Sequence, residues 1–583
     1  MNVPDPQAIA SAWMSQFGDP TQWQSWFSKA PTVDVNPMAA LMQDAGASIR
    51  PDAMEKLKND YLNDFGLLWQ EFLAGKTPTL ADQRFGSPAW LSNPMSSFNA
   101  ASYLLNAKFL SSMVDTVETT PQQKQKIRFA VQQLIDAMSP ANFLATNPEA
   151  QQMLIETKGE SLTKGMANML ADMNKGHISL SDETAFEVGR NLAITPGTVV
   201  YENKLFQLIQ YSPSTPTVRQ RPLLMVPPCI NKFYILDLQP DNSLVRYVVE
   251  QGNTVFMISW VNPGKKLAST TWDDYVEQGV IEAMRVVAEI SGQEKLNLFG
   301  FCVGGTLLST ALAVLAARGQ KPAASVTLLT TFLDFADTGV MNVFIDETQV
   351  ALREHQLKDG GLMLGRDLAS TFSSLRPNDL VWNYVQSNYL KGNESKPFDL
   401  LYWNSDGTNL PGPMFCWYQR HTYLENSLKV PGKLTVAGEK IDLGTIDAPA
   451  FIYGSKEDHI VPWTSAFSSM NIVNPGKPQA NRFILGASGH IAGVINSPAK
   501  NRRSYWRNDQ PADAAAASAA SGPHDAEAWK AGATETPGSW WPEWAKFLAE
   551  HGGKDVKAKA TPGNAQYKAI EPAPGRYVKM QAD

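Results

Sequence analysis

The clearest pattern in the chain is a series of short apolar runs that begins near residue 186 and alternates with stretches of helical periodicity. This alternation is typical of buried parallel strands joined by crossover helices. A segment at 199–211, ahead of the series, predicts an antiparallel hairpin. The runs lie at 222–228, 253–260, 295–301, 324–335, 448–454 and 481–487. We therefore expect a mainly parallel sheet within residues 186–583.

The first 185 residues follow a different pattern. Helical periodicity at 51–75 and 124–139 is separated by breaks rich in proline and asparagine, and no convincing strand is visible. We expect a mostly helical N-terminal domain, residues 1–185. Its aromatic residues either pack between helices or cover a partner or a hydrophobic surface, and the pattern leaves both open. They include Trp13, Trp23, Trp26, Phe27, Trp69 and Phe72.

A long insertion, about residues 338–445, separates the fourth of the predicted parallel strands from the fifth. It contains no comparable series of strands and is rich in aromatic residues and proline, as at 375–390 and 409–424. An insertion at this place is expected to form a cap over the active site and to exclude water. Beyond the last predicted strand, an alanine-rich stretch suggests a surface loop, and 537–553 predicts a short amphipathic helix that begins in a tryptophan cluster.

Composition narrows the function classes. The 583 residues are 43% hydrophobic, enough for sizeable cores, and the net charge is -7. A protein that binds nucleic acid usually presents a basic face, so the charge gives no support for that partner. The N-terminus lacks the basic start and apolar core of a secretory signal. We therefore expect a cytoplasmic protein that does not bind nucleic acid.

Cysteine usage and hydropathy add further limits. Cys229, Cys302 and Cys416 are too few and too scattered for a disulfide framework, and no CxxC or HExxH motif indicates a metal site. The most apolar stretches, such as 307–317, are well short of the roughly 20 residues that a membrane-spanning helix needs. We expect no metal and no transmembrane segment, so any lipid or polymer would be met at the protein surface.

The sequence "NLFGFCVGGT", residues 297–306, carries the strongest chemical signal. An apolar strand runs into a helix through a Gly-x-Cys-x-Gly motif, which is the pattern of a nucleophile elbow with cysteine in place of the usual serine. Together with the order of strands, it predicts an α/β-hydrolase fold with a large cap insertion. Cys302 is the expected nucleophile.

Two later strand ends supply partners in the chain order that this fold uses: nucleophile, acid, histidine. Asp458 follows the strand at 448–454, and His490 follows the strand at 481–487. We expect His490 to be the base and Asp458 to orient it. His459 competes for the role of base, but neighbouring residues of an extended segment point in opposite directions. We assign His459 to a supporting or structural position.

The oxyanion hole of such a site uses the backbone N–H after the nucleophile, here that of Val303, and one from the loop after the early strand at 222–228. Two prolines open that loop and have no N–H, so the second donor is expected near Ile230 or Asn231. Cys229 lies close by in the sequence. A buried apolar role for Cys229 fits better than a catalytic one.

A cysteine nucleophile favours thioester chemistry. A neighbouring imidazole and the start of a helix promote the reactive thiolate. Exchange of one thioester for another is nearly balanced in energy and leaves the acyl group activated, so a hydroxyl can then accept it to form an ester. Cys302 therefore points to acyl transfer onto an alcohol.

Several longer motifs resemble those of class I polyhydroxyalkanoate (PHA) synthases, and the likeness covers most of the chain beyond roughly residue 60. The motifs are "MSPANFLATNPEA", "ETAFEVGRN", "PLLMVPPCINKFYILDLQP", "LNLFGFCVGGT", "LLTTFLDFADTG", "FDLLYWNSDGTNLPGPMFCWY", "YGSKEDHIVPW", "GASGHIAGVINSPAKN", "GSWWPEW" and "EPAPGRYVK". This resemblance implies an enzyme that polymerises (R)-3-hydroxyacyl-CoA, typically short-chain monomers such as 3-hydroxybutyryl-CoA, with release of CoA.

The resemblance also implies roles and partners. Cys302 would carry the acyl group or growing polyester as a thioester, His490 would activate the thiol, and Asp458 would orient His490 or assist the 3-hydroxyl. Members of the family act as homodimers on cytoplasmic polyester granules, where granule-associated proteins are possible partners. They need no cofactor, because CoA belongs to the substrate and the product.

Alternatives stay open at this point. The same triad would serve a thioesterase or depolymerase with water as acceptor, and the tryptophan-rich N-terminal region would also suit a non-enzymatic granule coat protein. Chain growth uses either one thiol or two, with Cys229 as the second. Asp237 and Trp417 either line the pocket or have packing and capping roles.

Overall fold

The computed structural model describes residues 48–508 and 525–582. Trp13, Trp23, Trp26 and Phe27, which the sequence pattern singles out, lie outside the described residues, as does most of the alanine-rich stretch. The chain divides into two compact units. The smaller unit contains residues 48–69 and 104–132, and the larger one contains residues 70–103 and 133–582.

The smaller unit is formed from parts of three helices, each of which begins at a proline. These helices are α4 (Pro51–Leu73), α6 (Pro94–Asp115) and α7 (Pro121–Ala137). Proline suits the first turn because an N–H at that position has no partner within the helix. The helices predicted at 51–75 and 124–139 are confirmed. A two-residue ladder, β1 (Ser48–Ile49) with β2 (Val117–Glu118), was not predicted, because so short a pair leaves no periodicity.

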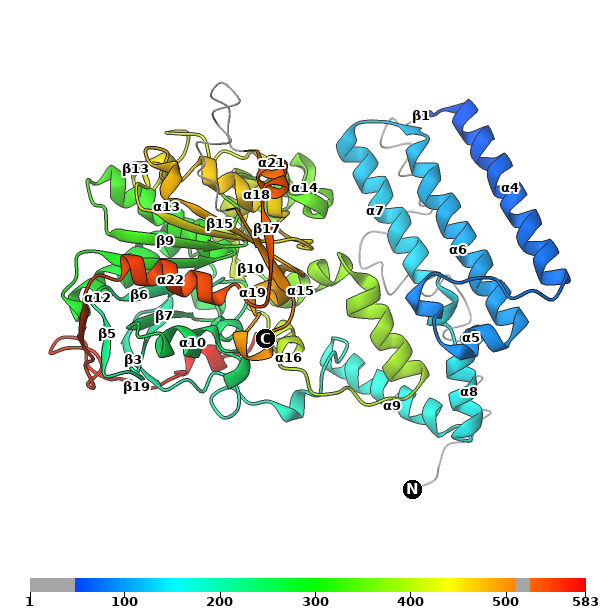
Figure 1. Ribbon diagram of the computed structural model, residues 1–583, viewed down its shortest axis with the longest axis horizontal. Helices are drawn as coiled ribbons and strands as arrows, with labels where there is room; N and C mark the ends of the chain where they lie inside the picture. The colour runs from blue at the N-terminus through cyan, green and yellow to red at the C-terminus, as the bar shows by residue number, and fades with distance from the viewer. Residues whose placement is uncertain (1–47, 509–524, 583) are drawn as a thin grey trace. The chain divides into compact units, whose positions relative to one another are not determined.

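An eleven-stranded sheet is the centre of the larger unit, in the order β17-β16-β15-β14-β9-β8-β6-β7-β4-β3-β19 (Figure 1). The six strands from β15 to β7 are parallel, and the strands at both edges are antiparallel. The parallel strands are β6 (Leu223–Val226), β7 (Val255–Trp260), β8 (Leu296–Phe301), β9 (Ala323–Leu329), β14 (Ala450–Ser455) and β15 (Arg482–Gly486). All six predicted parallel strands are confirmed.

The edges of the sheet were predicted only in part. The hairpin expected at 199–211 is present as β3 (Gly197–Glu202) and β4 (Phe206–Tyr211). The other edge strands, β16 (Ser504–Arg507), β17 (Thr534–Pro537) and β19 (Glu571–Pro572), were missed. They are short and rich in polar residues, so their pairing depends on the neighbouring strand and not on their own apolar pattern.

Helices cover both faces of the sheet. One face packs against α12 (Glu282–Ser291) and α13 (Val303–Ala317), and the other against α10 (Leu244–Glu250) and α22 (Trp541–His551). Strand β8 serves both cores, because Leu298 faces the first and Phe299 the second. The helix predicted at 537–553 is confirmed as α22. Its tryptophans pack in the core of that face, and Trp544 donates its indole N–H to Thr327 Oγ1 at 2.9 Å.

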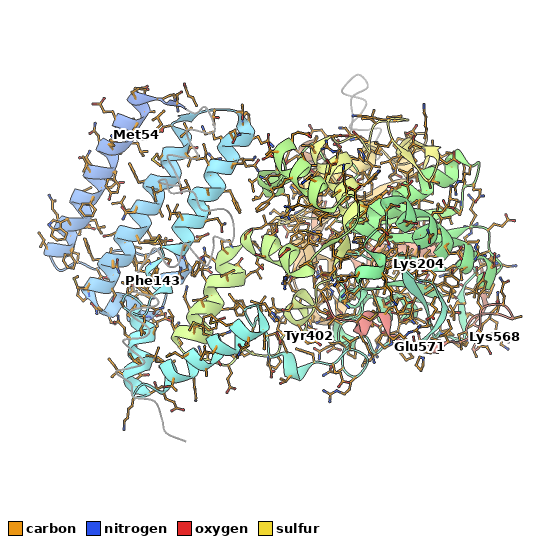
Figure 2. The ribbon with its side chains drawn as sticks, turned by 180° about the vertical axis from the view of Figure 1, so that it is seen from behind. Met54, Phe143, Lys204, Tyr402, Lys568 and Glu571 are labelled. Atoms are coloured by element: carbon orange, nitrogen blue, oxygen red, sulfur yellow. The ribbon has the colours of Figure 1, made fainter. Side chains whose placement is uncertain are left out.

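The insertion at 338–445 is mainly helical. Its regular helices are α14 (Glu347–Leu357), α15 (Gly365–Ser374), α16 (Asp399–Ser405) and α17 (Gly412–Tyr418). Its short strands pair only with one another, β10 (Leu362–Met363) with β11 (Leu410–Pro411) and β12 (Thr435–Val436) with β13 (Glu439–Lys440). Tyr402 of α16, labelled in Figure 2, packs its ring 5.4 Å from that of Phe186.

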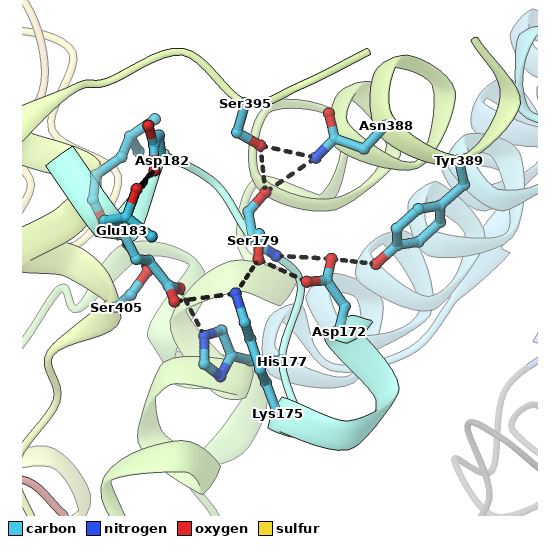
Figure 3. A network of polar contacts seen from close by, with 12 residues as sticks. Asp172, Lys175, His177, Ser179, Asp182, Glu183, Asn388, Tyr389, Ser395 and Ser405 are labelled. Carbon is cyan, nitrogen blue, oxygen red and sulfur yellow. Dashed lines mark hydrogen bonds and ion pairs between the residues drawn. The ribbon is translucent and has the colours of Figure 1, made fainter. Parts of the chain in front are cut away.

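A polar network attaches the insertion to α9 (Glu160–Lys175), as Figure 3 shows. Buried Asp172 accepts hydrogen bonds from the hydroxyls of Tyr389 at 2.8 Å and Ser179 at 2.5 Å. Asn388 donates to the Ser179 carbonyl at 3.0 Å. Residues 133–185 thus belong to the same compact unit as the sheet. The domain boundary predicted at residue 185 stays a prediction.

Substitution of Gly304 by Ala should destabilise the protein. The new Cβ would lie 2.3 Å from the Val226 carbonyl oxygen and 2.6 Å from that of Pro227. Overpacking against backbone atoms costs about 1–3 kcal/mol. Thermal and denaturant unfolding would measure the loss. Gly476→Ala, whose Cβ would meet no atom within 4 Å, is the matched control. Equal stability of the two variants would contradict this account of how α13 packs on the sheet.

Candidate active site

Cys302 lies at the sharp turn between β8 and α13. Its backbone angles are φ 52° and ψ -128°, a strained conformation for a residue with a side chain, and one that nucleophile elbows adopt. The end of β9 holds the turn on both sides. The Cys302 N–H donates to the Leu329 carbonyl at 3.0 Å, and the Thr331 hydroxyl donates to the Cys302 carbonyl at 3.2 Å. The thiol is therefore fixed at the carboxyl end of the sheet.

Asp458 and His490 meet at the same edge of the sheet. Asp458 follows β14 and His490 begins α19 (His490–Val494), and Asp458 Oδ2 lies 2.7 Å from His490 Nδ1. The other carboxylate oxygen, Oδ1, accepts the N–H groups of Ile460 at 2.8 Å and Val461 at 2.9 Å. Both side chains are buried, with exposed fractions of 0% and 5%. The carboxylate is thus held so that it faces the imidazole.

The environment of His490 stabilises its protonated form. Burial lowers the pKa of His490, but the charge and hydrogen bond of Asp458, together with the neighbouring Cys302, outweigh burial and raise it above its ordinary value. The ring also stacks on Phe301 at 5.8 Å. The three residues predicted as a triad therefore lie close together, with His490 hydrogen-bonded to Asp458. Their catalytic roles stay predictions.

The tryptophan cluster at the start of α22 fixes the helix that carries His490. Trp540 donates its indole N–H to the Gly493 carbonyl at 3.1 Å, and Trp541 donates to that of Val494 at 2.9 Å. Both side chains are fully buried. Each of these bonds satisfies a carbonyl at the end of the short helix α19, where no partner is available within the helix.

His459 lies beside the triad and is uncharged at neutral pH. Burial, together with the positive charges of His490 and Arg376, lowers the pKa of His459 to about 4. Its Nδ1 atom is buried and has no hydrogen-bond partner within the described part of the chain. These features place His459 next to the site as a neutral ring. They agree with the supporting position expected for it, which stays a prediction.

The loop after β6 lies against the first turn of α13. Gly304 has no Cβ, and the carbonyls of Val226 and Pro227 come close to it. The Pro227 carbonyl also accepts the indole N–H of Trp260 at 3.0 Å. Val303 is the first residue of α13, and Ile230 lies further along the loop, half-buried. The loop therefore begins beside the first turn of α13, and the oxyanion roles of Val303 and Ile230 stay predictions.

Cys229 is buried in this loop and close to the nucleophile. Its thiol is 1% exposed. Burial raises the pKa of Cys229 to about 12, and the charge of Cys302 adds to the shift. The thiol of Cys229 therefore stays protonated at neutral pH.

Asp237 and Trp417 occupy structural positions. Buried Asp237 accepts hydrogen bonds from the hydroxyls of Thr195 and Ser243, both at 2.6 Å, and burial raises its pKa to about 6. Trp417 stacks on Trp272 at 4.6 Å. These contacts fit the capping and packing alternatives. They do not connect either residue to the triad.

Two tyrosines of the insertion, Tyr418 and Tyr423, lie beside the nucleophile and were missed in the sequence. Burial raises the pKa of both phenols, and the nearby Cys302 raises it further. Their rings are 5.6 Å apart, and the Tyr423 ring packs on Phe335 at 5.0 Å. Only the aromatic richness of 409–424 signalled them. Both half-buried phenols therefore lie in the neighbourhood of Cys302.

Among residues 48–508 and 525–582, no three His, Cys, Asp or Glu side chains are grouped so that they could hold a metal ion. Within the same ranges, no helix has the length and apolarity to cross a membrane. The site thus consists of a thiol, an imidazole and a carboxylate, with two tyrosines nearby. This set suits nucleophilic acyl transfer.

Two family models match the chain. One, described as "Poly-beta-hydroxybutyrate polymerase (PhaC) N-terminus", matches residues 81–248. The other, described as "alpha/beta hydrolase fold", matches residues 222–496, which contain the parallel strands and the triad. The predicted α/β-hydrolase fold is confirmed.

Curated relatives match most of the chain. A protein of Cupriavidus necator named "Poly(3-hydroxyalkanoate) polymerase subunit PhaC" is 57% identical and covers 97% of this chain and 96% of its own. A "Poly(3-hydroxyalkanoate) polymerase" of Methylorubrum extorquens is 40% identical over 87% of this chain and 82% of its own. One of Rhizobium meliloti, also named as the PhaC subunit, is 39% identical over 86% and 80%. The chain belongs to the poly(3-hydroxyalkanoate) polymerase (PhaC) family, as its motifs predict.

Proposed function

We propose that the protein polymerises (R)-3-hydroxyacyl-CoA, with short-chain monomers such as 3-hydroxybutyryl-CoA, into polyester with release of CoA. The observation that carries the proposal is a cysteine at the elbow close to His490, which is paired with Asp458. The names of the relatives support polyester synthesis. The reaction needs no cofactor, because CoA enters as part of the substrate.

The first step loads the enzyme. The Cys302 thiol gives its proton to His490, and the sulfur attacks the thioester carbonyl. The resulting oxyanion accepts hydrogen bonds from the N–H groups of Val303 and Ile230. The C–S bond to CoA then breaks, and the CoA thiolate takes the proton from His490. One thioester replaces another, so the acyl group keeps its activation.

The second step extends the polyester. The 3-hydroxyl of another acyl unit attacks the acyl-cysteine carbonyl and gives its proton to His490, which Asp458 orients. The bond to sulfur breaks, the Cys302 thiolate takes the proton, and an ester remains. Ester formation from a thioester is downhill. Tyr418 and Tyr423 would keep water away from the acyl group while the hydroxyl arrives.

The proposal also covers the oligomeric state of the protein and its location in the cell. We propose a homodimer that works in the cytoplasm at the surface of polyester granules, where granule-associated proteins are candidate partners. Exposed apolar side chains on the helices, among them Leu62, Leu67 and Ile155, suit contact with an apolar surface. Chain growth through Cys302 alone fits the burial of Cys229.

Incubation of the protein with 3-hydroxybutyryl-CoA should give an acyl adduct on Cys302, free CoA and insoluble polyester. Mass spectrometry of the Cys302 peptide and a thiol assay for CoA measure the first two. Cys302→Ala is the control and should give neither. Release of free 3-hydroxybutyrate without polymer would contradict synthesis and favour the hydrolase. If the Cys302→Ala variant still performed the biological role of the protein, a non-enzymatic coat protein would be favoured.

Asp458→Asn should move the reactivity of Cys302 to higher pH. The carboxylate raises the pKa of His490, so the imidazolium that stabilises a thiolate persists at higher pH in the wild type than in the variant. If the pKa of His490 falls by one, the pair of thiolate and imidazolium becomes about tenfold less favourable, and alkylation of Cys302 by iodoacetamide near pH 7 slows by about tenfold. The measurement is the alkylation rate between pH 5 and pH 10, with exposed Asp359→Asn as control. If the alkylation rates of the two variants depended on pH in the same way, the proposed effect of Asp458 on His490 would be ruled out.

Cys229→Ala should keep polymerisation within about threefold of the wild-type rate, because a thiol with a pKa of about 12 is not a nucleophile at neutral pH. The measurement is polymer yield and chain length with 3-hydroxybutyryl-CoA. Normal acylation of Cys302 with lost elongation would instead identify Cys229 as a second carrier.

A further inference from the structure

The loop that follows β6 contains a buried lysine that the mechanism does not use. The Lys232 side chain is 2% exposed, and its ammonium group lies 3.9 Å from a carboxylate oxygen of Asp406. It donates hydrogen bonds to the backbone carbonyls of Val578, at 3.1 Å, and Met580. Lys232 thus ties a loop beside the nucleophile to a segment nearly 350 residues away, the C-terminal tail.

The insertion holds the same loop from another side. Trp403 of α16 donates its indole N–H to the Lys232 carbonyl at 2.7 Å. The Thr408 N–H donates to the Ile230 carbonyl at 3.2 Å, and Asn231 pairs with Gly407 in an isolated antiparallel bridge. Three consecutive loop residues, Ile230 to Lys232, are therefore each bound by the segment 403–408.

The Lys232 ammonium requires these partners. Burial lowers the pKa of Lys232, and the charge of Asp406 partly offsets this effect. A buried cation is stable only when its donors are satisfied, so the tail carbonyls and Asp406 fix the ammonium in one place. The backbone of residue 232 is then fixed from both its side chain and its carbonyl.

This position matters because the loop itself has little regular structure. Pro227 and Pro228 have no N–H groups, and the short helical turn at Phe233–Leu236 begins only after Lys232. The direction of the Ile230 N–H is therefore set by the groups that hold residues 230–232. An oxyanion donor must point at the developing charge within a few tenths of an ångström to be effective.

We propose that Lys232 is a positioning residue, which aims the Ile230 N–H at the substrate carbonyl by anchoring the loop to the C-terminal tail and to the segment 403–408. The inference rests on the proposed function, because it concerns the oxyanion donor of that reaction. Lys232 itself does not touch the reacting atoms. Its effect is confined to steps that form an oxyanion.

Two reactions of the Cys302 thiol distinguish a displaced oxyanion donor from a general disturbance of the site. Acylation of Cys302 by 3-hydroxybutyryl-CoA passes through an oxyanion, whereas alkylation by iodoacetamide does not. Lys232→Met keeps the apolar stem and removes the ammonium. It should slow acylation by about tenfold to a hundredfold, less than the roughly hundredfold to thousandfold loss when an oxyanion donor is removed outright, and leave the alkylation rate within about twofold. Steady-state turnover should show a lower kcat with little change in KM.

Lys204→Met is the matched control, since Lys204 is exposed in the turn between β3 and β4 and is labelled in Figure 2. If Lys232→Met does not fold, Trp403→Phe provides the second test. It keeps a buried aromatic ring, although a smaller one, and removes the N–H that the Lys232 carbonyl accepts. The same selective loss of acylation is expected.

The outcomes are distinct. Acylation and alkylation that fall together, or acylation that is unchanged in the variants, would overturn the positioning role while the wild type still forms acyl-Cys302. A wild-type protein that forms no acyl-Cys302 would overturn the proposed function, and the role of Lys232 with it.

Discussion

The close approach of α13 to the sheet is the constraint on which the site depends. Gly304 and Gly305 leave no room for a Cβ, which at these positions would meet the Val226 carbonyl at 2.3 Å and the Thr331 side chain at 2.2 Å. Because the helix begins this close to β6 and β9, the preceding residue is forced into a sharp turn. The strained backbone of Cys302 and the position of the loop after β6 both follow from this contact.

The rest of the site is held by segments far away in the chain. His490 begins a helix of only five residues, too short to be stable alone, and the tryptophans at the start of α22 satisfy its terminal carbonyls. The tail and the insertion likewise hold the loop at Lys232. Each part of the proposed site thus has a strand end that places it and a distant donor or acceptor that fixes its direction.

This division explains how much the sequence could predict. Cys302, Asp458 and His490 follow apolar strands directly, so local pattern and chain order were enough to bring them to one edge. The six parallel strands were visible for the same reason. Tyr418, Tyr423 and Lys232 gave no such signal, because their positions result from contacts between segments distant in sequence. The polar edge strands escaped because neighbours, not their own residues, determine their pairing.

The cysteine nucleophile and the two tyrosines near it, Tyr418 and Tyr423, fit one proposed reaction. In the proposed reaction, a thioester at Cys302 would keep the acyl group reactive toward a hydroxyl, but equally toward water, so the nucleophile would be useful for polymer synthesis only where water is scarce. The phenols of Tyr418 and Tyr423 have pKa values above their ordinary value, so they stay neutral and would not act as bases that activate water. In the proposed reaction this would leave His490 as the base beside the thioester.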